Sequence, residues 1–196
     1  APWRLLSRPA LRRHLLLSTL AFAAMFTGFS YVGLLLRQAG LGDGSVTFAL
    51  LAFGVAGLGG NWLAGRLASH ALAATAASAL ITAAMALTIA TDMGPVAAGL
   101  AVLIWGAAHA AAFVFCQVRV MDAAPDAPGF AGSLNISAAN IGIAIGSLVG
   151  GKAIAFGGVA SAAAAGCVLA LLAVSVAAMC RGVVADKKSP LWKRNK

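Results

Sequence analysis

Apolar residues fill six stretches of this chain, and only short segments separate them. The stretches cover residues 15–36, 46–67, 71–90, 95–118, 130–155 and 159–180. A helix needs about 20 apolar residues to cross the hydrocarbon core of a bilayer, and each stretch reaches that length. The intervening turns are rich in glycine, proline and aspartate, which end helices. We therefore predict an all-α integral membrane protein with six transmembrane helices.

The composition excludes a soluble globular domain. Hydrophobic residues make up 61% of the 196 residues, charged residues only 10%, and the mean hydropathy is +0.94. A typical soluble domain has about half apolar and about a quarter charged residues. A polar side chain in lipid is costly unless it is paired, so the few polar residues inside the spans become the candidates for function.

The basic residues mark one side of the predicted bundle. Six spans place both termini on the same side, and 12 of the 14 Lys and Arg residues fall there. They are Arg4, Arg8, Arg12, Arg13, Arg66, Arg119, Arg181, Lys187, Lys188, Lys193, Arg194 and Lys196; Arg37 and Lys152 fall on the other side. Because cytoplasmic loops carry the excess of Lys and Arg, we expect both termini in the cytoplasm. The predicted organisation is a basic lead-in at 1–14, a transmembrane domain at 15–182 and a basic tail at 183–196.

The net charge of +9 does not indicate nucleic-acid binding. Lys and Arg flank the spans and form no single patch with aromatic platforms, as a nucleic-acid surface would. We expect membrane lipid as a partner of these charges, and no nucleic acid.

Motifs of catalysis and metal binding are missing from the sequence. It has no HExxH motif, no phosphate-binding loop and no pair of acidic residues within a span. Ser133 and Ser147 lie outside a Gly-x-Ser-x-Gly setting, which disfavours an intramembrane serine protease. The three cysteines, Cys116, Cys167 and Cys180, have no metal-binding spacing and are interpreted as packing residues. We expect no enzyme, no cofactor and no metal.

Four residues form a stripe along the fourth span. Trp105, His109, Phe113 and Gln117 recur every four residues and so share one face of a helix. His109 is the ionisable residue predicted to lie near the middle of a span. It either lines a substrate cavity and carries a proton, or is a neutral histidine bonded inside the bundle. We take the four as candidates for a substrate cavity.

Small residues recur every four positions in two other spans. The fifth span carries Ala138, Gly142, Gly146 and Gly150, and the second carries Gly57, Asn61 and Gly65. Such stripes let helix backbones approach closely in lipid, either for plain packing or for smooth movement. The amides of Asn61 and Asn140 lie within these stripes, which favours packing roles. Asn135, near one end of its span, is a candidate gate residue.

Two segments resemble the second half of major facilitator superfamily transporters. One is GVAGLGGNWLAGRLA at 54–68, and the other is APDAP at 124–128 followed by SLNISAANIGIAIG at 133–146. The likeness is to the bacterial drug and sugar efflux branch, the arabinose-efflux-permease-like carriers. It implies that the six spans are helices seven to twelve of a twelve-helix carrier, built as an inverted repeat of three plus three helices. Arg66 would lie in the family's loop that stabilises one state of transport, although Ser69 and His70 stand where an Asp is frequent.

The resemblance implies efflux of a small organic solute by alternating access in a bacterial inner membrane, in exchange for protons. The partner would be an N-terminal six-helix half in the same chain, or a second copy of this half. The chain begins at Ala1 without Met, which agrees with a piece of a longer protein. Two alternatives stay open: a membrane module or assembly partner that does not transport, and a half-carrier that works as a homodimer.

Overall fold

The structure is a computed structural model that describes residues 2–91 and 94–187, with side chains for 5–91 and 94–180. The predicted basic tail at 183–196 and its residues Lys188, Lys193, Arg194 and Lys196 therefore lie largely outside the described residues. The helices are α1 (Pro9–Phe29), α2 (Val32–Gln38), α3 (Asp43–Arg66), α4 (Ala71–Ala90), α5 (Pro95–Asp122), α6 (Pro128–Gly157) and α7 (Val159–Lys187), with short 3-10 helices η1 (Pro2–Ser7) and η2 (Ala68–His70).

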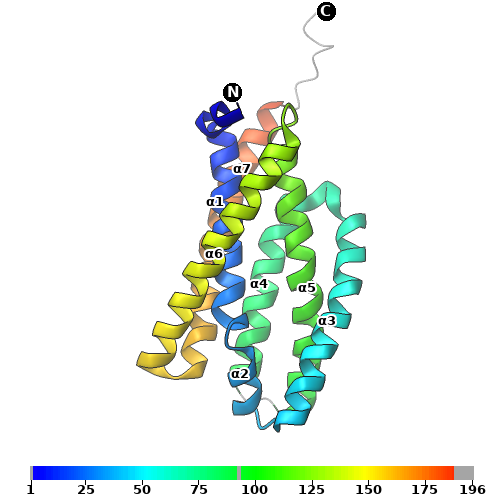
Figure 1. The fold of residues 1–196 in the computed structure, drawn as a ribbon, viewed down its shortest axis with the longest axis vertical. Coiled ribbons are helices and arrows are strands. Elements are labelled where there is room, and N and C mark those ends of the chain that lie inside the picture. Colours follow the sequence, from blue (N-terminus) through cyan, green and yellow to red (C-terminus); the bar gives the residue numbers. More distant parts are fainter. Residues whose placement is uncertain (1, 92–93, 188–196) are drawn as a thin grey trace, which may run out of the picture.

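The all-α membrane fold is confirmed. Within the described part of the chain, five single helices are long and apolar enough to cross a membrane, and the pair α1–α2 makes a sixth span when it is counted as one. The helices run along one common axis and form an elongated bundle (Figure 1). Proline at the first turn starts α1, α5 and α6, where the backbone N–H would lack a helical partner anyway. Gly158, with φ +78°, makes the tight turn from α6 to α7.

The first predicted span is a broken helix rather than the continuous helix expected at 15–36. Its two parts, α1 and α2, are bent by 42° at Ser30 and Tyr31. Both residues bond to Ser147 of α6: Ser30 Oγ lies 2.7 Å from Ser147 Oγ, and Tyr31 OH donates to the Ser147 carbonyl at 2.8 Å. Contacts with another helix therefore hold the bend.

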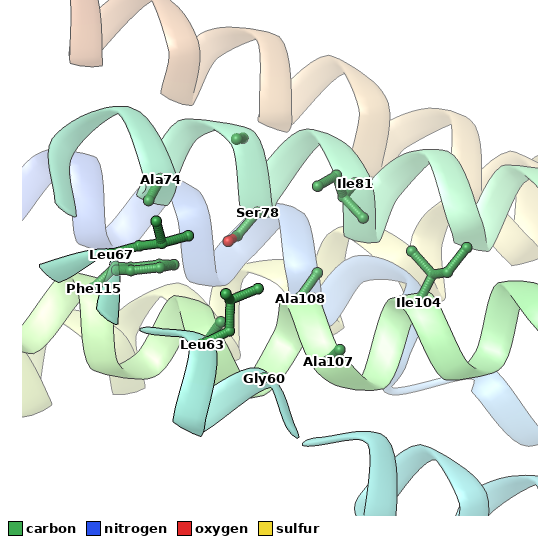
Figure 2. A pocket seen from close by; sticks show the side chains of 12 residues that line it. Gly60, Leu63, Leu67, Ala74, Ser78, Ile81, Ile104, Ala107, Ala108 and Phe115 are labelled. Atoms are coloured by element: carbon green, nitrogen blue, oxygen red, sulfur yellow. The ribbon is translucent and has the colours of Figure 1, made fainter. Parts of the chain in front are cut away.

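The first three-helix repeat consists of α1–α2, α3 and α4, and the second of α5, α6 and α7. The first helix of each repeat packs mainly on helices of the other repeat. α1 of the first repeat packs on α6 and α7 of the second, and α5 of the second packs on α3 and α4 of the first. α3 and α6 consequently lie at opposite edges of the bundle, with α1 and α5 between them (Figure 1). One pair breaks this symmetry. α6 packs along α7, whereas α3 and α4 touch only marginally and leave a groove with α5 as its floor (Figure 2).

Glycines make the closest helix contacts. Gly142, Gly146 and Gly150 of α6 lie against the backbone carbonyl oxygens of Thr19, Ala23 and Thr27 of α1, all at four-residue spacing. A Cβ added at any of the three glycines would collide with the facing backbone. This agrees with the close approach that the small-residue stripe predicted for Gly142 and Gly146.

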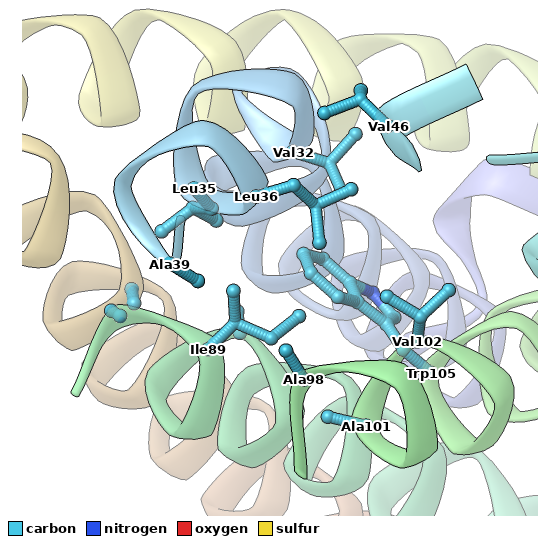
Figure 3. Packing of buried hydrophobic residues seen from close by; sticks show 13 residues of the cluster. Val32, Leu35, Leu36, Ala39, Val46, Ile89, Ala98, Ala101, Val102 and Trp105 are labelled. Atoms are coloured by element: carbon cyan, nitrogen blue, oxygen red, sulfur yellow. The ribbon is translucent and has the colours of Figure 1, made fainter. Parts of the chain in front are cut away.

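A buried apolar cluster surrounds Trp105 at the end of the bundle that contains α2 (Figure 3). The indole is completely buried, and side chains from four other helices surround it. The other members of this cluster that are labelled in Figure 3 are Val32, Leu35, Leu36, Ala39, Val46, Ile89, Ala98, Ala101 and Val102. A Cβ added at Gly28 would lie 3.0 Å from Cβ of Ala86, so glycine allows α1 to approach α4 closely beside the indole.

Candidate functional site

Aromatic rings enclose His109 of α5. The imidazole is 6% exposed, and four phenylalanine rings have centroids within 5.6 Å of its own. These rings belong to Phe26 and Phe29 of α1 (5.2 and 4.5 Å), Phe53 of α3 (5.5 Å) and Phe113 of α5 (5.6 Å). We call these residues, together with Phe22 and Trp105, the aromatic cluster. It joins three helices at the middle of the bundle.

Phe113 is the most exposed member of the aromatic cluster, while Phe26, Phe29 and Phe53 are partly buried. Phe113 is 42% exposed, and its ring packs edge to face on Phe22 at 4.5 Å. The cluster therefore has a buried centre at His109 and an accessible edge at Phe113. Such an edge can stack against a flat or apolar solute.

Two polar atoms inside the aromatic cluster have no partner among the described residues. They are Nδ1 of His109 and Nε1 of Trp105, both buried. Buried polar groups are normally hydrogen-bonded, so an unpaired ring nitrogen deserves an explanation. An imidazole with a free nitrogen can accept or donate a hydrogen bond once a polar group enters the cluster.

A second group, the polar network, lies nearer the end of the bundle where α1 begins. Arg119 of α5 is 3% exposed and donates to the carbonyl oxygen of His14 at 2.7 Å and to Ser18 Oγ at 2.7 Å. Ser18 Oγ donates in turn to Asn135 Oδ1 at 2.7 Å, and Asn135 Nδ2 donates to Gln117 Oε1 at 2.8 Å. The network thus ties α1, α5 and α6 together.

The charge of Arg119 is not neutralised by a carboxylate within the described residues, where the ion pairs are Arg8–Asp126 and Arg37–Asp43. Its third close contact is Nδ1 of His14, 2.9 Å from Nη1. The Nε atom of Arg119 is buried and has no partner. A buried guanidinium without a counter-charge is costly, which makes the position unusual for a purely structural residue.

An exposed ion pair closes the same end of the bundle. Arg8, just before α1, donates through both terminal nitrogens to Asp126 in the α5–α6 turn, at 2.6 and 2.8 Å. The hydrogen bond to the carboxylate raises the pKa of the Arg8 guanidinium. The pair connects two segments that lie 118 residues apart in the sequence.

The four residues predicted to line a substrate cavity lie in two different environments. Trp105 and His109 are buried in the aromatic cluster, Phe113 forms its exposed edge, and Gln117 belongs to the polar network. Gln117 also donates from Nε2 to Met121 Sδ at 3.5 Å. The stripe thus leads from one group to the other, and its role in substrate binding stays a prediction.

The residues predicted for packing or movement also divide. Asn135 is 4% exposed and hydrogen-bonded, whereas the side chains of Asn61 and Asn140 are exposed and form no hydrogen bond with the described residues. Gly65 faces open space, unlike Gly142 and Gly146. The exposed guanidinium of Arg66 stacks on Trp62, with Cζ 3.5 Å from the ring centroid.

Sequence reasoning missed the phenylalanines of α1 and the pair His14–Arg119. Phe22, Phe26 and Phe29 recur at four and three residues, the helical spacing of one face, which was an available signal. The hydropathy pattern predicts an end of the fourth span at 118, which would make Arg119 a charge flanking the span. The helix continues to Asp122, which places Arg119 inside it.

Comparisons with known proteins identify the family of the chain. The sequence model of the Major Facilitator Superfamily matches residues 1–147. The inner membrane transport protein YdhP of Escherichia coli K12 is 34% identical over 156 residues, which cover 78% of this chain and 40% of that protein, and YdhP of E. coli O157:H7 matches equally. The chain thus spans about two fifths of the length of these curated relatives. With its membrane-spanning helices and a family match over most of its length, this chain belongs to the Major Facilitator Superfamily.

Proposed function

We propose that these helices form one half of a secondary transporter that moves a small organic solute across the membrane by alternating access. Family membership supports transport, and the relatives are named inner membrane transport proteins. The relatives are longer than this chain, which agrees with a second six-helix half elsewhere in the working carrier. The proposed direction is efflux in exchange for protons.

The observation that carries the proposal is His109 with its unpaired Nδ1 inside the aromatic cluster. This combination offers apolar and aromatic contact on α1, α3 and α5, together with one polar atom at the middle of the bundle. Ligand sites in proteins have this composition, mostly apolar with a few placed polar groups. In the proposed carrier the exposed edge at Phe113 faces the solute.

The polar network has a different proposed role. It joins the ends of α1, α5 and α6 through side chains whose partners can exchange, with Arg119 as the donor at its centre. In an alternating-access cycle, such contacts form in one state and separate in another. We assign the network, with the Arg8–Asp126 pair beside it, to closing this end of the pathway.

Everted membrane vesicles test the proposal. The coding sequence that contains these residues is expressed once as the 196 residues alone and once with its natural flanking sequence. An imposed proton gradient is then challenged with ethidium, an aromatic cation, and with arabinose, a neutral sugar. We expect solute-dependent loss of the gradient only with the longer form.

The other outcomes separate the alternatives. Transport by the 196 residues alone favours a half that works as a homodimer. No gradient loss and no accumulation of either probe in a folded, correctly inserted protein favours a membrane module that does not transport. Both outcomes contradict the proposed half-carrier.

A further inference from the structure

A groove opens to the outside of the bundle between α3 and α4. It encloses about 380 Å³, which lies within the range of about 300–1,000 Å³ that ligand pockets occupy. Leu63 and Leu67 line it from α3 and its end, Ala74 and Ile81 from α4, and Ile104 and Phe115 from α5. Ser78 supplies the hydroxyl that points into it (Figure 2). The lining is otherwise apolar.

The groove exists because the two repeats differ at this place. In the second repeat α6 packs along α7, but in the first repeat α3 and α4 stay apart. Gly60 draws α3 onto α5 instead, since its Cα faces the backbone of Ala107 without space for a Cβ. The opening is thus built into the helix packing and does not depend on one side-chain rotamer.

The length of the groove is close to the thickness of one membrane leaflet, and along α5 the groove extends on both sides of the position of His109. Along α5 it extends from Ile104 to Phe115, which is about 16 Å at about 1.5 Å per residue. The hydrocarbon core of a bilayer is about 30 Å thick, so one leaflet is about 15 Å. The groove occupies the half of α4 that follows its start at Ala71 and the half of α3 that precedes Arg66.

A positive charge lies where α3 ends, on Arg66, which is next to the lining residue Leu67 in the sequence but does not itself line the groove. Arg66 is the last residue of α3, one position before Leu67 and three after Leu63, both of which line the groove. Its exposed guanidinium stacks on Trp62 and forms no ion pair with a carboxylate of the described residues. Trp and Arg together are typical of the level of the lipid headgroups.

We propose that the groove binds one acyl chain of an anionic phospholipid, whose phosphate pairs with Arg66. The apolar walls take the chain through its leaflet, the hydroxyl of Ser78 lies along its path, and the guanidinium at the end of α3 selects the negative headgroup. The inference requires only that the helices span a membrane, so it is independent of the transported solute and of the direction of transport.

The test measures lipid retained by the protein in its natural sequence context. The purified protein is delipidated in detergent, titrated with dioleoyl phosphatidylglycerol or dioleoyl phosphatidylcholine, and examined by native mass spectrometry. One basic residue near a membrane surface favours anionic lipid by about fivefold, and we expect a preference of that size for the first bound phosphatidylglycerol.

Three variants distinguish the contribution of the groove to lipid binding from that of the charge on Arg66. Ala77→Leu fills the groove from α4 and should abolish tight binding of the first lipid, whereas Ala73→Leu, an exposed position of the same helix outside the groove, should bind as the parent does. Arg66→Gln should keep the bound chain but bind both lipids equally.

Several results would overturn the inference. One is equal binding of the two lipids by the parent protein. Another is unchanged lipid retention in Ala77→Leu, or an equal loss in Ala73→Leu. A dimer that Ala77→Leu disrupts would assign the groove to a second copy of the chain instead. Each result is read on protein whose thermal unfolding matches the parent, so that misfolding is not mistaken for lost lipid.

Discussion

At the scale of single residues, the position of Arg119 is the least expected feature of the protein. The side chain carries a positive charge into the interior, and the groups that it contacts are a hydroxyl, a carbonyl and an imidazole. Removing one member of such a buried network leaves others unsatisfied, whereas a fully bonded network fixes the relative position of its helices. Asn135 is the member that connects α6 to both other helices.

Replacing Asn135 by Leu should lower the free energy of unfolding by about 1–3 kcal/mol, because Gln117 and Ser18 each lose a buried partner. Asn140→Leu on the same helix should change it by less than about 0.5 kcal/mol, since that side chain is exposed and outside the network. Thermal unfolding in detergent, monitored by circular dichroism, measures both. Equal destabilisation by the two substitutions would contradict the assignment of Asn135 to the network.

Two substitutions test whether His109 acts through its aromatic ring or through the proton that its imidazole can carry. His109→Phe keeps an aromatic ring among the four phenylalanines, and His109→Ala removes it. We expect both to reduce transport and to abolish any pH dependence between about pH 5 and 8, the interval in which an imidazole titrates. His109→Phe should retain more thermal stability. Unchanged transport and an unchanged pH profile in both variants would remove His109 from the mechanism.

At the scale of helices, glycine positions decide which helices meet. Gly60 and Gly59 are neighbours on α3, yet only Gly60 faces another backbone, that of Ala107. Gly59 has open space around it. The pair therefore provides a matched test of helix contact against helix propensity.

Gly60→Ala should destabilise the protein by about 1–3 kcal/mol, because α3 must move away from α5 to accommodate the new methyl group. Gly59→Ala should be neutral or stabilise the protein by up to about 1 kcal/mol, since alanine favours a helix over glycine. Denaturation of the two variants beside the parent measures the difference. A similar loss in both would mean that the α3–α5 contact is not limiting for stability.

Most helix boundaries could be predicted from the sequence. The starts at Ala71, Pro95 and Val159 follow directly from breaker residues and hydropathy. The bend at Ser30 and Tyr31 could not, because its cause is bonding to Ser147, more than 100 residues away in the chain. The same holds for the site. The spacing of the four-residue stripe on α5 can be seen in the sequence. The phenylalanines of α1 and α3 that contact it cannot be predicted, because tertiary packing brings them there.

At the scale of the whole molecule, the bundle presents two kinds of surface. One side contains the groove between α3 and α4, and we assign it to lipid. The other contains Phe113, the exposed edge of the aromatic cluster, which the proposed function assigns to a water-filled cavity between two halves. Thiol reactivity distinguishes water from lipid, because only a hydrated thiol ionises readily.

Phe113→Cys should therefore react with a charged, water-soluble thiol reagent in membranes, after Cys116, Cys167 and Cys180 have been replaced by Ala. Leu171→Cys is the control, an exposed position on α7 that we expect to face lipid and to stay unlabelled. Transported solute should slow the labelling of Phe113→Cys. Labelling at Leu171→Cys alone would contradict the assignment of Phe113 to a water-filled cavity.

The packing of α1 on helices of the second repeat has a consequence for biogenesis. α1 obtains its main neighbours only when α6 and α7 have been synthesised, and 119 residues separate Thr19 from Ala138, to which it bonds. At about 5–20 residues per second, the ribosome needs about 6–24 s for that distance. For most of this interval His14 and Ser18 lack Arg119, which follows them by 105 and 101 residues, and Ser18 also lacks Asn135, which follows it by 117. We therefore expect that an insertase or chaperone that shelters the early helices raises the yield of the folded protein, and that a chain arrested after α4 is degraded faster than the finished protein.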